Sequence, residues 1–79
     1  MHTCPVCYYD KMEDPPERFN ICPCCGTEFE NDDYWLTREE LRQAWVDGGM
    51  KWWYIDEAPP SDWSPEDQLR KARKIDPGQ

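Results

Sequence analysis

Two Cys-x-x-Cys pairs constrain the fold of this chain more than any other feature of its sequence. Both pairs lie in the first third of the chain, and the fourteen residues 8–21 separate them. A gap of two residues lets one tight turn direct two sulfurs at a single ion, and two such turns complete a tetrahedral shell. The sequence therefore predicts one metal site with four thiolate ligands, which are Cys4, Cys7, Cys22 and Cys25.

The chain is short enough to need a metal ion or another cross-link for stability. A chain of 79 residues cannot build a large core, and scaffolds of this size usually depend on a disulfide, a metal or a partner. The five cysteines form an odd set, which argues against a fully paired disulfide framework. Residues 1–5 show no secretory signal, and no segment approaches the ~20 apolar residues of a membrane span. We expect one cytoplasmic domain over residues 1–79, with reduced cysteines and no membrane association.

The residues around the cysteines predict a zinc ribbon, which is a short β-hairpin with two cysteine knuckles, over residues 1–33. Alternating apolar and polar residues indicate short strands at 19–21 and 27–30. Gly26 follows the second knuckle, where the chain often needs a positive φ, but Tyr8 holds the matching place after the first. Because tyrosine rarely adopts a positive φ, we expect the first knuckle to be less regular or strained.

The fifth cysteine, Cys24, is not a predicted ligand, because one residue between it and Cys22 would spoil the knuckle. It is interpreted as a small buried residue, with a redox or alternative-ligand role left open. His2, the single histidine, is a weaker candidate for replacing one cysteine. A closed four-thiolate shell has no position for water or substrate, which predicts a structural Zn²⁺ ion. Rubredoxin-type electron carriers hold iron in the same way, but the long aromatic tail and the lack of a paired redox site favour zinc.

Two helices are predicted after the cysteines. In the aromatic-rich segment 34–57, Thr37 and Glu40 form a capping box, so a helix is expected over residues 38–47. Its apolar face is predicted to hold Leu41, Ala44 and Trp45.

The segment 58–79 opens with a Pro-Pro turn and carries the second predicted helix. Ser64 is a cap and Pro65 suits the first helical position. Four cations lie toward its carboxyl end, where the helix dipole favours them. Pro77-Gly78 is expected to stop the helix.

The charge of the chain bears on its partners. The formal net charge is −8, and Zn²⁺ with four thiolates would add a further −2. Nucleic-acid affinity comes largely from Lys and Arg at phosphates, so direct nucleic-acid binding is not expected. The paired carboxylates Asp32-Asp33 and Glu39-Glu40 suit a loop or cap and a helix start rather than acid–base catalysis. We therefore expect a protein that is not an enzyme.

The five tryptophans suggest what the chain binds. Most are expected in the core, yet so small a domain cannot easily bury every ring. Adjacent Trp52 and Trp53 point to opposite faces of an extended segment, so one of them is expected at the surface. Trp52, Trp53 and Trp63 are the candidate interface residues, since Trp dominates binding hot spots.

The favoured function is a zinc-stabilised protein-interaction module whose partner is not identified and has a basic surface. One alternative is an acidic inhibitor that mimics nucleic acid on a basic protein, and another is a rubredoxin-like iron carrier. Exposed aromatic residues also allow a homodimer.

The cysteine-bearing segment resembles the bacterial cysteine-rich CPCC family of small proteins. The resemblance covers residues 4–33 and rests on Cys4-Pro5-Val6-Cys7, Pro15-Pro16, Ile21-Cys22-Pro23-Cys24-Cys25-Gly26 and Asp32-Asp33. The Cys-Pro-Cys-Cys string usually belongs to the first knuckle of that family, whereas here it forms the second. The resemblance implies a zinc-binding module with no settled activity. A looser resemblance links small acidic proteins of this kind to immunity proteins and phage-encoded inhibitors.

Overall fold

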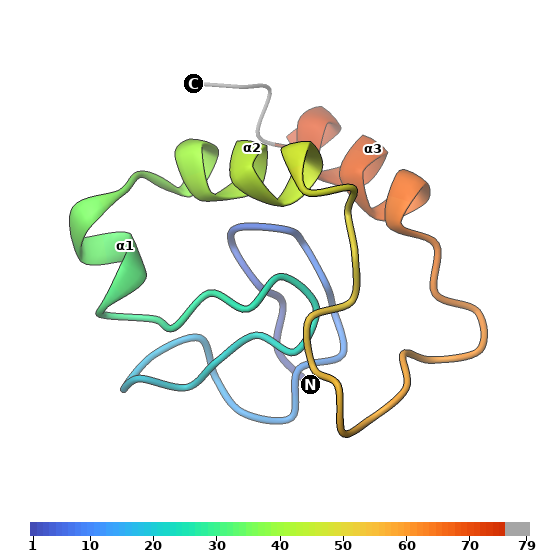
Figure 1. Cartoon of the computed structure of the whole chain (residues 1–79), viewed down its shortest axis with the longest axis horizontal. Coiled ribbons are helices and arrows are strands. Elements are labelled where there is room, and N and C mark those ends of the chain that lie inside the picture. Colours follow the sequence, from blue (N-terminus) through green and yellow to red (C-terminus); the bar gives the residue numbers. More distant parts are fainter. Residues whose placement is uncertain (76–79) are drawn as a thin grey trace.

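The computed structural model describes residues 1–75 and contains three short helices (Figure 1). They are α1 (Asp32–Trp35), α2 (Arg38–Asp47) and α3 (Pro65–Ile75). α2 and α3 lie along one side of the molecule, and the two loops that carry the cysteines lie beneath them (Figure 1). The helices therefore form a partial cover over an irregular, cysteine-bearing segment.

The bounds predicted for α2 are confirmed, because its ends are set by local chemistry. The Thr37 hydroxyl accepts the Glu40 backbone N–H at 3.0 Å, and the Glu40 carboxylate accepts the Thr37 backbone N–H at 2.9 Å. This reciprocal capping box satisfies two donors that the first turn leaves without partners. At the other end the Gly48 N–H donates to the Ala44 carbonyl.

The predicted start of α3 is also confirmed. Pro65 is its first residue, and the Ser64 hydroxyl accepts the Asp67 backbone N–H at 3.3 Å. Leu69 and Ala72 form the buried stripe. The stop predicted at Pro77-Gly78 lies outside the described residues.

The predicted zinc-ribbon hairpin is wrong. Residues 1–75 contain no β-strand, and extended pairing is limited to two isolated bridges, His2–Met12 and Ile21–Glu28. Each bridge closes the loop around one knuckle. Left-handed backbone angles explain the loss of the predicted strands, since Phe19 has φ 62° and Glu30 has φ 68°. Such residues cannot continue an extended strand.

The first helix, α1, was not predicted. Asp32 and Asp33 were interpreted as loop or cap residues, and their carboxylates do accept backbone N–H groups of the preceding turn. Asp32 Oδ2 accepts from Glu28 at 2.8 Å, and Asp33 Oδ1 accepts from Glu30 at 2.7 Å. The two side chains thereby hold the turn that leads into α1.

The buried core is centred on the cysteines. Val6, Met12 and Phe29 are fully buried around them, and Trp45 of α2 and Leu69 of α3 join the same cluster. A row of aromatic rings continues from this core. The Trp52 ring lies edge-on to Tyr9, with centroids 5.3 Å apart, and edge-on to Trp63 at 5.4 Å.

Candidate metal centre

The two Cys-x-x-Cys knuckles share one backbone frame. The Tyr8 N–H donates to the Cys4 carbonyl at 2.9 Å, and the Gly26 N–H donates to the Cys22 carbonyl at 2.8 Å. In each knuckle the N–H of the first cysteine also donates to the carbonyl five residues later, at 2.8 Å and 3.0 Å. Tyr8 has φ 66° and Gly26 has φ 80°. The first knuckle is therefore as regular as the second, and Tyr8 adopts a backbone angle that strains a tyrosine.

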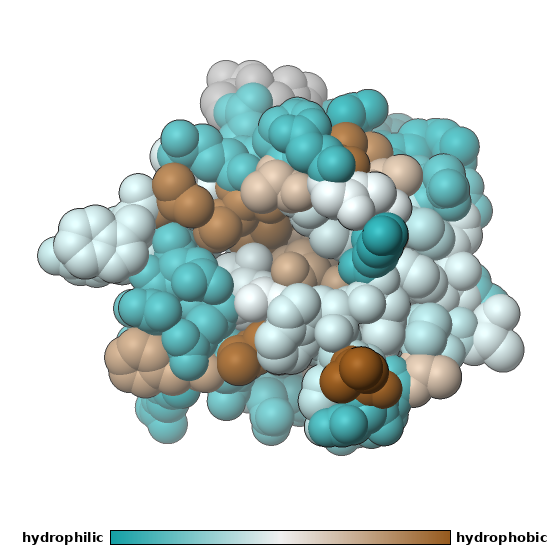
Figure 2. Space-filling model, in the orientation of Figure 1, coloured by the Kyte–Doolittle hydropathy of each residue, from teal (hydrophilic) through white to brown (hydrophobic). Residues whose placement is uncertain are grey.

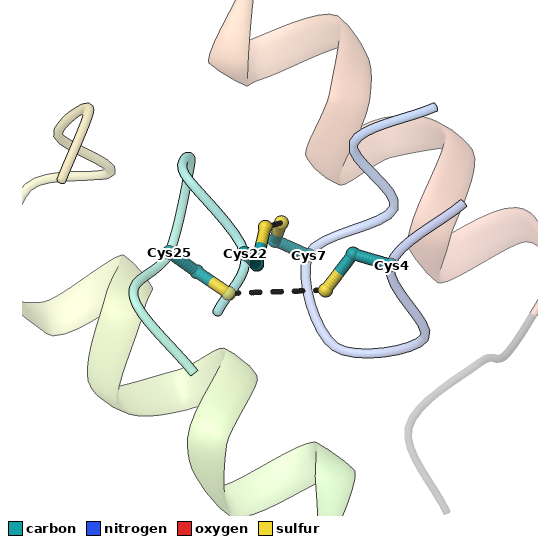
Figure 3. Close-up of side chains that lie close together, drawn as sticks. All are labelled: Cys4, Cys7, Cys22 and Cys25. Atoms are coloured by element: carbon teal, nitrogen blue, oxygen red, sulfur yellow. Dashed lines mark hydrogen bonds between the residues drawn. The ribbon is translucent and has the colours of Figure 1, made fainter. Parts of the chain in front are cut away.

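The knuckles bring the four predicted ligands together. Their sulfurs point into one space between the two loops (Figure 3), and all four Sγ atoms lie within 4.8 Å of one another. The Sγ atoms of Cys4 and Cys25 are 3.8 Å apart, and those of Cys7 and Cys22 are 3.7 Å apart. A tetrahedral ion with metal–sulfur bonds of about 2.3 Å has sulfurs about 3.8 Å apart. The cluster is compatible with a metal-binding site.

Two hydrogen bonds support the sulfurs. The Val6 backbone N–H donates to Cys4 Sγ at 3.4 Å. The buried Thr27 hydroxyl lies 3.2 Å from Cys25 Sγ, where it can donate to a thiolate. Donors of this kind orient metal ligands and spread their negative charge.

Burial and mutual hydrogen bonds shift the pKa values of three of the four clustered thiols. Burial, with hydrogen bonds among the thiols, raises the pKa of Cys7 well above its ordinary value. Hydrogen bonds with Cys25 and Cys4 raise the pKa of Cys22, whereas bonds with Cys22, Cys4 and Cys7 lower that of Cys25. Four thiolates need a bound cation to offset their mutual repulsion and burial.

The carbonyl groups of the knuckles face distant parts of the chain. Arg42 of α2 is 5% exposed, and its Nε donates to the Val6 carbonyl at 2.6 Å. Its NH2 group donates to the Pro5 carbonyl at 3.3 Å, and its guanidinium carbon lies 5.5 Å from the centre of the Tyr8 ring. Arg42 therefore ties α2 to the first knuckle.

Two further segments bind knuckle carbonyls. Gln68 of α3 donates from Nε2 to the Cys7 carbonyl at 2.9 Å. The Trp53 N–H donates to the Cys24 carbonyl at 3.0 Å, and the Tyr54 N–H donates to the Pro23 carbonyl at 2.9 Å. Both knuckles are thus the points at which the rest of the chain attaches.

Sequence reasoning missed Arg42 and Gln68. It placed Ala44 on the buried face of α2, but Ala44 is exposed and Arg42 is buried instead. The spacing in the sequence could have indicated the burial of Arg42, because it precedes Trp45 by three residues and the two side chains therefore share one face of the helix. No local pattern marks Gln68.

Cys24 is fully buried but is not one of the four clustered sulfurs. Its Sγ accepts a hydrogen bond from Gln68 Nε2 at 3.3 Å. This environment agrees with the interpretation of Cys24 as a small buried residue.

Replacement of Cys24 by alanine should leave the metal content unchanged. We expect Cys24→Ala to retain one metal ion per chain and to lose about 1 kcal/mol of stability, since only one buried sulfur is removed. The matched variant Cys25→Ala, one residue away, should lose the metal. Elemental analysis of both purified variants is the measurement. Loss of metal from Cys24→Ala would show that Cys24 takes part in the site.

The candidate interface tryptophans lie in different environments. Trp52 and Trp63 are half-buried, and their indole N–H groups donate to the Glu57 carbonyl at 2.7 Å and to Gln68 Oε1 at 3.0 Å. Trp53 is 51% exposed, so the expectation that one of the adjacent pair reaches the surface is confirmed. Its ring covers Gly26, where a Cβ atom would lie 2.5 Å from Trp53 Cδ1.

A second exposed aromatic group was not predicted. Tyr34 and Trp35 of α1 are 74% and 77% exposed, and their ring centroids are 4.9 Å apart. A pale projection over α1 is visible at the left edge of Figure 2. On the face shown, brown apolar surface is divided into separate areas among teal polar residues (Figure 2).

Comparison of the chain with protein-family models, with curated proteins and with solved structures found no match. The resemblance to the CPCC family therefore stays a prediction that rests on the residues that carry it. Within residues 1–75, no helix has both the length and the apolar character that a bilayer crossing requires.

Proposed function

We propose that the chain is a non-enzymatic protein-interaction module held together by one structural zinc ion. The observation that carries the proposal is the inward cluster of four sulfurs, with cross-knuckle distances of 3.7 and 3.8 Å. Four cysteine ligands fill a tetrahedral shell, and a filled shell suits a structural ion rather than a catalytic one.

The contacts of the knuckles support a role for the ion in holding the fold. α2, α3 and residues 53–54 all donate to knuckle carbonyls. An ion that fixes the knuckles therefore also fixes the surface that these segments present.

The exposed side chains support a protein partner. Trp53 and Trp35 are both more than half exposed on a small chain of net charge −8. Exposed tryptophan is common at binding hot spots, and the negative charge favours a partner with a basic surface.

Metal content and partner capture test the proposal. Protein purified without added metal should be colourless and hold one zinc per chain. The zinc-loaded protein should retain partners from the cells that express it, and the metal-stripped protein should lose them. A red protein with iron and a reversible redox wave would instead indicate an electron carrier. Equal capture by loaded and stripped protein would refute the role of the ion.

A further inference from the structure

An open groove of about 670 Å³ lies beside the second knuckle. Its lining includes buried Met12, half-buried Trp52, and the more exposed side chains of Ile21, Trp53 and Tyr54. The Trp53 and Tyr54 rings are nearly parallel, with an interplanar angle of 16° and centroids 6.3 Å apart. These side chains offer apolar and aromatic surface to an occupant.

The groove is also acidic. Glu13, Asp14 and Glu57 line it, and among residues 1–75 none of the three carboxylates forms an ion pair. Two lining residues carry a positive charge, Met1 through its terminal ammonium group and Lys11, whose Nζ lies 3.4 Å from Asp62 Oδ1. The charge of Lys11 is therefore partly offset by a carboxylate outside the groove.

Carboxylates beside exposed aromatic rings form a site for a cation on an apolar stem. A lysine or arginine side chain gains from the face of a tryptophan or tyrosine ring and from a nearby carboxylate, while its methylene groups cover apolar surface. The backbone N–H groups of Trp53 and Tyr54 already donate to knuckle carbonyls, so they are not available to pair with an added strand. Trp53 and Tyr54 therefore contribute to recognition through their side chains.

We propose that this groove binds a partner-protein segment in which arginine or lysine alternates with apolar residues. The inference rests on the proposed interaction function and specifies its surface and the chemistry of its partner. The acidic lining selects the cations, and Trp53 and Tyr54 contact both the cations and their apolar neighbours.

Titration with a defined peptide tests the groove directly. The probe is a blocked hexapeptide of alternating arginine and leucine, and the control peptide has glutamine at each arginine. Both are added to zinc-loaded, ¹⁵N-labelled protein, and amide and indole N–H resonances are followed. The indole N–H groups of Trp45, Trp52 and Trp63 donate to protein oxygens. We expect the arginine peptide to shift the Trp53 indole resonance saturably, with little effect at Trp35 on α1.

A matched pair of variants tests the role of charge. Glu13→Gln/Glu57→Gln neutralises two groove carboxylates, and Glu39→Gln/Glu66→Gln neutralises two exposed carboxylates on α2 and α3. Both variants lose two negative charges, so any general effect of net charge is the same. We expect about a fivefold loss of peptide affinity in the groove variant, as for two partly exposed ion pairs. The helix variant should bind as the parent does.

Several outcomes would overturn the proposal. The first is that millimolar arginine peptide leaves the Trp53 indole resonance unshifted, or shifts only the Trp35 resonance. The second is that the glutamine peptide produces the same shifts as the arginine peptide. The third is that both variants lose the same peptide affinity. A dimer with the groove signals already perturbed would identify a second copy of the chain as the occupant and would also overturn it. If the peptide fails but the zinc-loaded protein still captures partners, the groove assignment is wrong and the interaction function stands.

Discussion

Removal of the proposed zinc ion is expected to unfold the whole described chain, including α2 and α3, and not only the cysteine-bearing loops. Structural zinc contributes on the order of 10 kcal/mol to small domains, which is comparable to the total stability of a chain of this size. The helices depend on the knuckles because Arg42 and Gln68 bind their carbonyls. The helical circular dichroism signal should fall when a strong chelator is added to the loaded protein.

Two controls accompany this measurement. Zinc added in excess of the chelator should restore the helical signal, and Cys22→Ser should reproduce the effect of chelation without any chelator present. Retention of both helices after complete metal removal would contradict the dependence of the fold on the ion.

Replacement of Arg42 by alanine is expected to lower the free energy of unfolding by about 3 kcal/mol. Among the changes predicted here, only removal of the ion should have a larger effect. The substitution removes a buried charge-assisted hydrogen bond of 2.6 Å to the Val6 carbonyl and a partly buried one of 3.3 Å to the Pro5 carbonyl. It also removes the contact of the guanidinium with the Tyr8 ring. Chemical denaturation of the zinc-loaded protein, together with its zinc affinity, measures the loss.

The neighbouring arginine of the same helix provides the control. Arg38 is exposed at the first position of α2, so Arg38→Ala should change stability by less than about 0.5 kcal/mol. The stability lost by Arg42→Lys should lie between the losses of Arg42→Ala and Arg38→Ala, because lysine keeps the charge but not the planar group of donors. Equal stability of Arg42→Ala and Arg38→Ala would refute the attachment of α2 through this side chain.

Helices α2 and α3 and the two cysteine knuckles were predictable because each depends on residues close in sequence. Thr37 with Glu40, and Ser64 with Pro65, set helix starts within one turn. The two cysteines of each pair are also close in sequence, and hydrogen bonds within each knuckle close its turn.

The remaining features depend on interactions that no local pattern encodes. The strand prediction failed where Arg18, Phe19 and Glu30 adopt left-handed angles, although none of the three is glycine. The attachment of Arg42 and Gln68 to the knuckles was missed because their partners lie 36 and 61 residues away. Burial of an arginine on α2 also reverses the usual preference of that residue for the surface.

The attachment of α2 and α3 to knuckle carbonyls has a consequence for the order of folding. α2 and α3 have 10 and 11 residues, and isolated helices shorter than ~12–15 residues are marginal in water. We therefore expect each helix to be stable only when it packs on the knuckles. Because the proposed zinc ion would hold those carbonyls in place, we expect its capture to precede helix docking. The refolding rate should then rise with zinc concentration until ion capture is no longer the slow step.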